Sequence, residues 1–440
     1  MTTVYFSFDT EDFTSDHASD AVRDEANLLH EYGIRGNFNV VGYLARELVR
    51  NRRTDVLDAL NNHTISFHSL RHSYHPTINE YTDLESYDDA RAALELQEGQ
   101  GFGMVKAVCG VDEFPAAVPP GNSISYVAMY TYADWGIPLY LGSLFSTPHS
   151  EFVYFCNALH TSYDYALEEF LFDEGFDAAA FLDTIADRRS CVLYNHPNMV
   201  LYKRFWDGEN YAGANLRPMH DWIEPPRRSE EETARYYANL RRLIAALQAD
   251  DRFTISSIDE LAEKATANIR GRTVNRDQLS AIRDALAASF RWVTEPAELS
   301  VADCFFAAKH FLDSDEPYHP GRVHGFLQAP EGVSAPVTLT ADEVRRLAAM
   351  ADPAEFLPPY FEADGKRVGP ADLLFAMLDV AMGAETVTVT PKPQQCDYEA
   401  AYPSLKDTQL AHTWLHADSF EDRYLSDRLR LQAWTIRPEL

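Results

Sequence analysis

The strongest constraint on the fold is an alternation of short apolar, β-prone runs with helix-like segments through the first part of the chain. Such alternation is typical of βα units, whose strands form a mainly parallel sheet or barrel. We therefore expect an α/β domain that ends near residue 266. The strand-like runs are 4–8, 37–41, 64–67, 191–194 and 253–256, and the main helix-like segments are 20–32, 44–60, 88–98, 230–248 and 258–264.

Three acids follow the first strand-like run, in the stretch VYFSFDTEDF (residues 4–13): Asp9, Glu11 and Asp12. Neighbouring carboxylates repel one another, so they hold a cation, serve as a base or lie on a solvated loop. Because side chains alternate along a strand, Asp9 and Glu11 should face the same side. The spacing also allows Asp12 as the cation ligand.

The stretch FHSLRHSYHP (residues 67–76) follows another strand-like run and places His68 and His72 four residues apart. On a helical turn this spacing puts both imidazoles on one face. Parallel strands present their carboxyl ends at one edge, where active sites gather, so we expect the histidines to lie near the acids. Two histidines and a carboxylate form a divalent-metal set with an open position, which suits zinc and also iron, cobalt or nickel.

Because the acids of residues 4–13 are followed along the chain by the histidines of residues 67–76, the sequence resembles the polysaccharide deacetylase family (carbohydrate esterase family 4). FSFDTED followed by HSLRH matches its first two motifs, and VPPGNS (118–123), CVLYNHP (191–197) and the stretch 240–265 continue the order. The resemblance covers roughly residues 3–266. It implies a distorted (β/α) barrel with one divalent ion, usually zinc, and hydrolysis of an acetamide by water activated at that ion.

The resemblance also implies roles for individual residues. Asp9 matches the general base, and His196 matches the acid that protonates the leaving amine. The expected metal ligands are His68, His72 and either Glu11 or Asp12. Pro120 and Gly121 fall in the third motif and are expected to contact the substrate.

The third motif departs from the family at position 117, where Ala117 stands in place of an arginine that pairs with the catalytic aspartate. Either Asp9 has another partner, for which Arg71, Lys106 and Lys203 are candidates, or turnover is poor. The segment 147–183 is rich in aromatic residues, which either form core or line a wall of the substrate groove.

The remaining segment, 275–440, contains a weak internal repeat: SVADCFFAAKHFL (300–312) aligns with GPADLLFAMLDVA (369–381). A helical pattern precedes each copy, and a β-prone piece follows each copy, at 322–327 and 386–390. We expect a smaller α/β domain made of two similar repeats, about 275–340 and 341–405.

The net charge of −30 argues against unaided binding to nucleic acid or to anionic membrane surfaces, which needs clustered basic side chains. The five cysteines are dispersed, as expected for buried thiols in a reducing compartment. No apolar run is long enough to span a bilayer, and no secretory signal is recognised. These features predict a cytoplasmic protein without membrane insertion; the sequence does not indicate its oligomeric state.

The leading functional hypothesis is a metal-dependent hydrolase that removes an acetyl group from an N-acetylated sugar, glycan or related small amide. Two alternatives remain open. One is a carbohydrate-binding module that retains the metal but has little or no catalytic activity. The other is a hydrolase of a non-sugar C–N bond.

Overall fold

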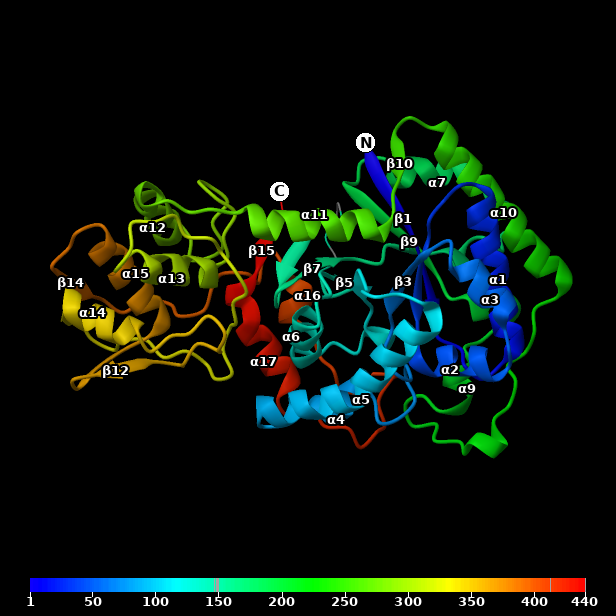
Figure 1. Ribbon diagram of the computed structural model, residues 1–440, viewed down its shortest axis with the longest axis horizontal. Helices are drawn as coiled ribbons and strands as arrows, with labels where there is room; N and C mark the ends of the chain where they lie inside the picture. Colours follow the sequence, from blue (N-terminus) through cyan, green and yellow to red (C-terminus); the bar gives the residue numbers. More distant parts are fainter. Residues whose placement is uncertain (146, 148–149, 412, 440) are drawn as a thin grey trace. The chain divides into compact units, whose positions relative to one another are not determined.

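The structure, a computed structural model, describes residues 1–145, 147, 150–411 and 413–439 (Figure 1). Two compact units divide the chain. The first comprises Met1–Glu151, His160–Glu263 and Gln409–Arg423, and the second comprises Phe152–Leu159, Lys264–Thr408 and Tyr424–Leu440. Each unit thus combines segments that are far apart in sequence. The predicted boundaries at 266 and 275 remain predictions.

The first unit is built on a curled, half-barrel parallel sheet with the strand order β5-β4-β3-β2-β1-β9-β8. A further strand, β10, pairs with the start of β1. The five strands expected at residues 4–8, 37–41, 64–67, 191–194 and 253–256 are present. The bounds are β1 Thr2–Thr10, β2 Asn37–Val40, β3 Thr64–Phe67, β4 Ala116–Ala117, β5 Leu139–Leu141, β8 Tyr165–Ala166, β9 Ser190–Asn195 and β10 Phe253–Ile255.

Strand β1 is the long central strand of this sheet, and nearly all of its residues are buried. It pairs with β9 along its length, while β10 and then β2 occupy its other side. Burial on both faces explains the almost continuous apolar run at residues 4–8, as is usual for parallel strands. The same pairing brings the carboxyl ends of β1, β2 and β3 to one edge.

Helices cover the sheet of the first unit, and their ends follow local signals. α1 (Asp16–Glu31) begins after Ser15, whose side chain caps it, and α5 (Tyr87–Cys109) ends at Gly110 in the left-handed conformation. The single helix expected over 44–60 is wrong, because Arg52 adopts a φ of 55° and separates two helices. The remaining helices are α2 Gly42–Arg50, α3 Thr54–Leu60, α4 Ile78–Thr82, α6 Tyr126–Asp134, α7 Ala178–Ile185, α8 Pro197–Leu201, α9 Trp206–Asn210, α10 Glu230–Ala249 and α11 Ile258–Gly271, with 3-10 turns η1 Pro120–Asn122, η2 Leu167–Glu169 and η3 Met219–Asp221.

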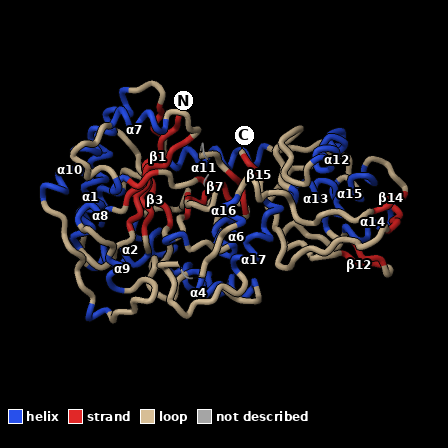
Figure 2. Tube along the Cα trace, turned by 180° about the vertical axis from the view of Figure 1, so that it is seen from behind, coloured by secondary structure: helices blue, strands red, loops and turns tan. Residues whose placement is uncertain are grey.

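The second unit contains helices and short strands, and β6–β15, β11–β14 and β12–β13 are antiparallel pairs among them (Figure 2). Its helices are η4 Arg276–Gln278, α12 Leu279–Ala288, α13 Val301–His310, α14 Ala341–Ala348, α15 Pro370–Ala381, α16 Pro403–Lys406, α17 Leu425–Leu431 and η5 Gln432–Thr435. Its strands are β6 Val153–Phe155, β11 Val337–Thr340, β12 Phe361–Ala363, β13 Lys366–Val368, β14 Thr386–Val389 and β15 Arg437–Pro438. Strand β7, Ala158–Thr161, begins in the second unit and ends in the first.

The two copies of the predicted repeat agree in their helices and differ in the segment after each helix. Asp303 accepts a hydrogen bond from the Ser300 amide at the start of α13, and Asp372 does the same for the Gly369 amide at α15. Strand β14 comes after the second copy, but residues 322–327 after the first copy form no strand. The expected equivalence of the two β-prone pieces is therefore wrong, and a domain of two repeats remains a prediction; residue 440 lies outside the described residues.

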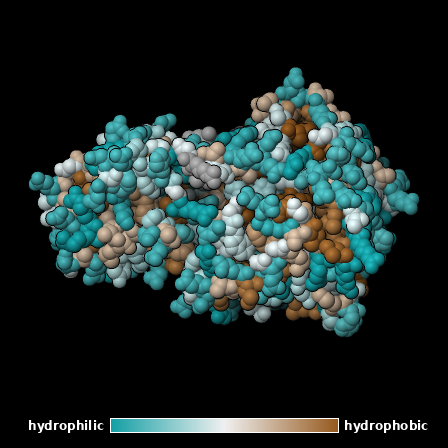
Figure 3. All heavy atoms as spheres, in the orientation of Figure 1, coloured by the Kyte–Doolittle hydropathy of each residue, from teal (hydrophilic) through white to brown (hydrophobic). Residues whose placement is uncertain are grey.

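Two further properties concern the whole described chain. None of the described helices has the length and apolar character that crossing a bilayer requires. All five cysteines are buried free thiols. On the face drawn in Figure 3, hydrophilic side chains predominate, and apolar ones gather in smaller areas.

Candidate metal and catalytic site

The acids and histidines singled out in the sequence meet at the carboxyl edge of the sheet. Asp9 is the penultimate residue of β1, Glu11 directly follows that strand, and His68 directly follows β3. Strand β2 lies between them, with Asn39 paired to Asp9. Glu11, His68 and His72 are all buried, with exposed fractions of 6%, 1% and 5%.

Glu11, His68 and His72 form a cluster in which one ligand atom from each residue lies within 4.8 Å of the others. Glu11 Oε2 is 2.9 Å from His72 Nε2 and 3.8 Å from His68 Nε2. Asp12 lies outside this cluster, and its carboxylate accepts hydrogen bonds from the amide and hydroxyl of Thr14. The geometry thus favours Glu11 over Asp12 as the carboxylate ligand.

The two imidazoles are oriented through their Nδ1 atoms. His68 Nδ1 donates to the carbonyl oxygen of Val118 (3.0 Å), and its Nε2 is buried without a hydrogen-bond partner. His72 Nδ1 lies 3.1 Å from Ser73 Oγ, and Ser73 donates to Asp207. In metal-binding histidines, one ring nitrogen usually has a hydrogen-bond partner and the other binds the cation. The cluster therefore fits a divalent cation.

The turn that carries the histidines is irregular, so the helical turn expected for His68 and His72 is wrong. Ser69 and His72 have positive φ angles of 73° and 51°, which side chains rarely adopt. The surroundings hold this turn in place. Glu98 of α5 accepts the Leu70 amide hydrogen bond, and a Cβ at Gly101 would lie 2.6 Å from Leu70 Cα, so only glycine fits there.

The electrostatics of the cluster are those of a carboxylate–imidazolium pair. Burial alone would lower the pKa of His72, but Glu11 and Asp207 raise it to about 10. Burial would raise the pKa of Glu11, but His72 and His196 hold it well below its usual value. A proton and a metal ion compete for His72 Nε2, so cation binding releases this proton.

Asp9 and His196 form a second group in the same place. His196 follows β9, and its Nε2 lies 3.7 Å from Asp9 Oδ2. Its Nδ1 donates to Glu168 of η2 at 2.5 Å. Burial alone would lower the pKa of His196, but Glu168 and Glu11 raise it to about 10. His196 is therefore a cation at neutral pH and carries a proton near Asp9.

Neutral side chains orient Asp9 where an arginine was expected. Asn39 Nδ2 (2.7 Å) and the Tyr163 hydroxyl (2.9 Å) both donate to Asp9 Oδ1. The three candidate cations have other partners. Arg71 bonds to Gln97, Lys106 lies over the ring of Phe102, and Lys203 pairs with Glu232, so the expectation that one of them replaces the arginine is wrong.

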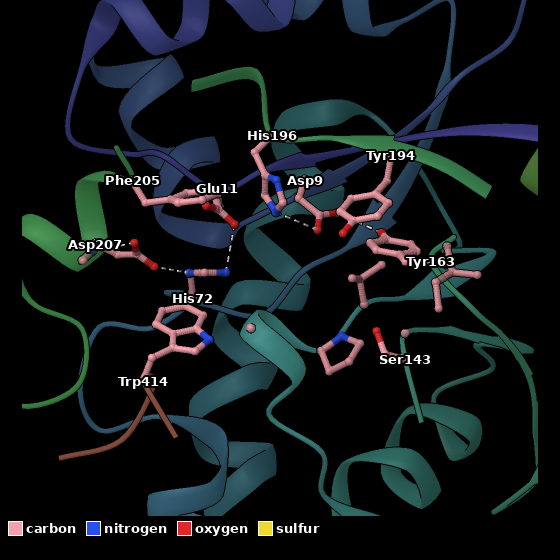
Figure 4. A pocket seen from close by; sticks show the side chains of 16 residues that line it. Asp9, Glu11, His72, Ser143, Tyr163, Tyr194, His196, Phe205, Asp207 and Trp414 are labelled. Carbon is pink, nitrogen blue, oxygen red and sulfur yellow. Dashed lines mark hydrogen bonds and ion pairs between the residues drawn. The ribbon is translucent and has the colours of Figure 1, made fainter. Parts of the chain in front are cut away.

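These groups open into one cavity of about 420 Å³ (Figure 4). Asp9, Glu11, His72 and His196 line its polar end. Of the two residues expected to contact a substrate, Gly121 lines the cavity; Pro120 does not, whereas its neighbour Pro119 does.

Several residues of the site were not anticipated from the sequence. Glu168 comes from the aromatic segment 147–183, of which residues 148–149 lie outside the described residues. Tyr163, from the same segment, lines the cavity, as the groove-wall alternative for this segment expects. The signal that could have found them is the placement of that segment between two strand-like runs. Asp207 follows His196 in a polar, aromatic stretch, and Trp414 comes from the distant C-terminal part; neither has a signal in its spacing.

No protein-family model and no curated protein matches the chain in sequence. Similar solved structures include a polysaccharide deacetylase from Mycobacterium smegmatis (18% identity, TM-score 0.40, covering 60% of this chain and 90% of that one). A 4-alpha-glucanotransferase from Thermococcus litoralis also aligns, with 10% identity and a TM-score of 0.40, and the alignment covers 65% of this chain and 46% of that one. A family 4 acetyl xylan esterase from Clostridium thermocellum, solved with cobalt, aligns with 12% identity and a TM-score of 0.33, and the alignment covers 60% of this chain and 91% of that one. These likenesses are too weak to carry an argument, so the function is inferred from the geometry of the site.

Proposed function

We propose that the protein is a metal-dependent hydrolase that removes an acetyl group from an N-acetylated sugar, glycan or related small amide. One observation supports this most directly. A buried Glu11–His68–His72 cluster, with an orphaned His68 Nε2, lies beside the Asp9–His196 pair, in which an acid and a base face each other.

Glu11, His68 and His72 would hold one divalent cation, zinc by ligand type and otherwise cobalt, nickel or iron. When bound, such a cation lowers the pKa of water and polarises a carbonyl oxygen. Three protein ligands leave coordination positions open to small molecules. Asp12 is the alternative carboxylate, although its hydrogen bonds to Thr14 occupy one of its oxygens.

The chain's own side chains supply the proton transfers. Asp9, held by Asn39 and Tyr163, accepts a proton from the attacking water. His196 Nε2 donates a proton to the leaving nitrogen. Glu168 fixes the tautomer of His196, because its bond to Nδ1 keeps one proton there and turns Nε2 into the cavity. Gly121 would contribute substrate contacts at the cavity wall.

A carbohydrate-binding module that retains the metal is the second candidate. The hydrogen bonds around Asp9 favour it, because neutral Asn39 and Tyr163 bond to this carboxylate and position 117, where the resemblance implies an arginine, holds Ala117. Both candidates predict metal binding, and only the hydrolase predicts turnover. Substitution of Asp9 therefore separates them.

The test is acetate release from a panel of N-acetyl sugars and small amides by the full-length, zinc- or cobalt-loaded protein. We expect turnover in the wild type and a loss of about 100- to 10,000-fold in Asp9→Asn, because a general base contributes about that much. His220→Ala is the matched control, since His220 is exposed and distant from the cluster in sequence. No release from any substrate, with ligand binding unchanged in Asp9→Asn, would favour the binding module.

A further inference from the structure

We propose that residues 409–411 and 413–423, the C-terminal strap, close one side of the candidate active-site cavity, and that Trp414 stacks on one sugar ring there. The substrate is then a short N-acyl sugar or a chain end rather than the interior of a polymer. This inference rests on the proposed hydrolase function for the N-acyl group and adds the size and orientation of the substrate.

The strap belongs to the first unit and is fixed there by hydrogen bonds. His416 Nδ1 lies 3.1 Å from the Thr77 hydroxyl, in the segment that follows the ligand histidines. The Gly213 amide donates to the Leu415 carbonyl. Further along, the Arg423 amide donates to Asp83. The strap is therefore held at several points around the cavity rather than lying loosely over it.

Trp414 differs from its neighbours in the strap. Leu415 and His416 are buried, with exposed fractions of 1% and 3%, whereas Trp414 is 55% exposed and lines the cavity. In Figure 4 its indole lies at the lower edge of the cavity and His196 at the upper edge. A large aromatic ring exposed inside a cavity, between anchored neighbours, presents a flat apolar surface to a ligand.

Two glycines make room for this indole and its backbone. Gly121 has a φ of 49°, and a Cβ there would lie 2.4 Å from Trp414 Cζ2. A Cβ at Gly213 would lie 2.4 Å from the Trp414 carbonyl oxygen. Any side chain at either position would displace Trp414, so loops from two separate parts of the first unit are fitted to the strap.

The chemistry of the walls identifies the ligand class. The polar end carries Asp9, His72 and His196, while Trp414 and Phe205 supply apolar surface. A sugar ring has one apolar face for an indole and a rim of hydroxyls, and its N-acyl group can reach the polar end. The volume of about 420 Å³ is at the small end of ligand cavities, which span roughly 300–1,000 Å³, so it suits a short ligand.

The test titrates the full-length protein with N-acetyl-D-glucosamine and with its N-acetylated tetramer; isothermal titration calorimetry measures the affinity of every variant, and tryptophan fluorescence is recorded where Trp414 is present. The Asp9→Asn background prevents turnover. We expect both sugars to quench fluorescence and the single sugar to bind no more than about 10-fold more weakly than the tetramer. Trp414→Ala should weaken binding of the single sugar about 10-fold, and Trp414→Phe should retain most of it, because the flat ring remains.

Trp292→Phe is the matched control, because Trp292 packs on Tyr402 in the second unit, and it should bind like the parent. Unchanged thermal unfolding midpoints verify that the variants fold. Equal affinity in Trp414→Ala, no quenching by the single sugar, or a preference for the tetramer well above 10-fold would overturn the inference. Quenching without any acetate release by the wild type would overturn the hydrolase proposal and leave the sugar subsite supported. Acetate release by the wild type, together with sugar binding that Trp414→Ala does not weaken, would overturn the sugar subsite and leave the hydrolase proposal supported.

Discussion

The metal-ligand cluster and the Asp9–His196 pair share one cavity but are supported in different ways. The ligand histidines lie within five residues of each other and are oriented by a backbone carbonyl and a serine hydroxyl. Asp9 and His196 instead depend on Tyr163 and Glu168, which come from another segment of the chain. Only His68 and His72 are thus neighbours in sequence; Glu11, Val118 and the members of the acid–base pair are brought to the site by the fold.

This difference suggests which features of such a site tolerate change. The Glu11–His68–His72 cluster contains the residue types that a divalent cation requires. At Asp9, neutral Asn39 and Tyr163 donate hydrogen bonds, and position 117, where an arginine was expected, holds Ala117. Substitutions can therefore separate metal binding from catalysis.

The largest effect is expected from His68→Ala. Loss of one of three ligands should reduce metal affinity by at least about 100-fold, because even outer-shell substitutions cost 10- to 100-fold. Elemental analysis after dialysis measures the metal directly, without reference to activity. His75→Ala is the control from the same stretch, since His75 bonds to Glu80 and to the Gly213 carbonyl outside the cluster. Equal metal content in His68→Ala and the wild type would contradict the assignment of His68 as a metal ligand.

The position of the acids and histidines directly after strands explains why this half of the site could be predicted from the sequence. Because β1, β2 and β3 pair in parallel, the residues that follow β1 and β3 lie at the same edge of the sheet. The local sequence also made β1, β2 and β3 predictable. The error over 44–60 is of the opposite kind, because Arg52 breaks the helix with no glycine or proline to signal it.

The dependence of Asp9 and His196 on the fold explains what could not be predicted. Charge alone suggested Arg71, Lys106 and Lys203 as partners of Asp9, but reach depends on where each element packs, and Asn39 and Tyr163 are closer. In the β-prone piece 322–327, Phe326 forms one isolated bridge to Leu357, and the piece does not extend into a strand.

Tyr163→Phe should reduce activity less than removal of a metal ligand does, and it tests whether catalysis can be weakened without loss of metal. It removes one hydrogen bond to the Asp9 carboxylate, which corresponds to about a 10-fold loss in kcat, with KM and metal content unchanged. Tyr165→Phe is the matched control, because its hydroxyl bonds to Arg188 outside the cavity. Steady-state kinetics together with elemental analysis would separate the two effects. A loss of metal in Tyr163→Phe would show that the halves of the site are coupled.

The smallest effect is expected from Glu25→Gln, which should change the pH dependence of stability. Glu25 contacts the residue before His196, a member of the acid–base pair. Buried Glu25 accepts hydrogen bonds from Asn195, next to His196, and from Tyr236, and burial raises its pKa to about 8. Between pH 4.5 and about 8 the folded protein therefore holds a proton that the unfolded chain releases. The free energy of unfolding should fall as pH rises through this window.

Glutamine keeps an amide oxygen as acceptor for Asn195 and Tyr236 but cannot ionise, so Glu25→Gln should flatten this decline and raise the unfolding midpoint most at pH 8. The support of His68, the Val118 carbonyl, does not titrate, and the metal content of Glu25→Gln should match the wild type. Thermal unfolding at several pH values measures the slope. Parallel curves for the two proteins would mean that Glu25 is already ionised in the fold, and the acid–base half would then be no more sensitive to pH through this residue than the ligand half.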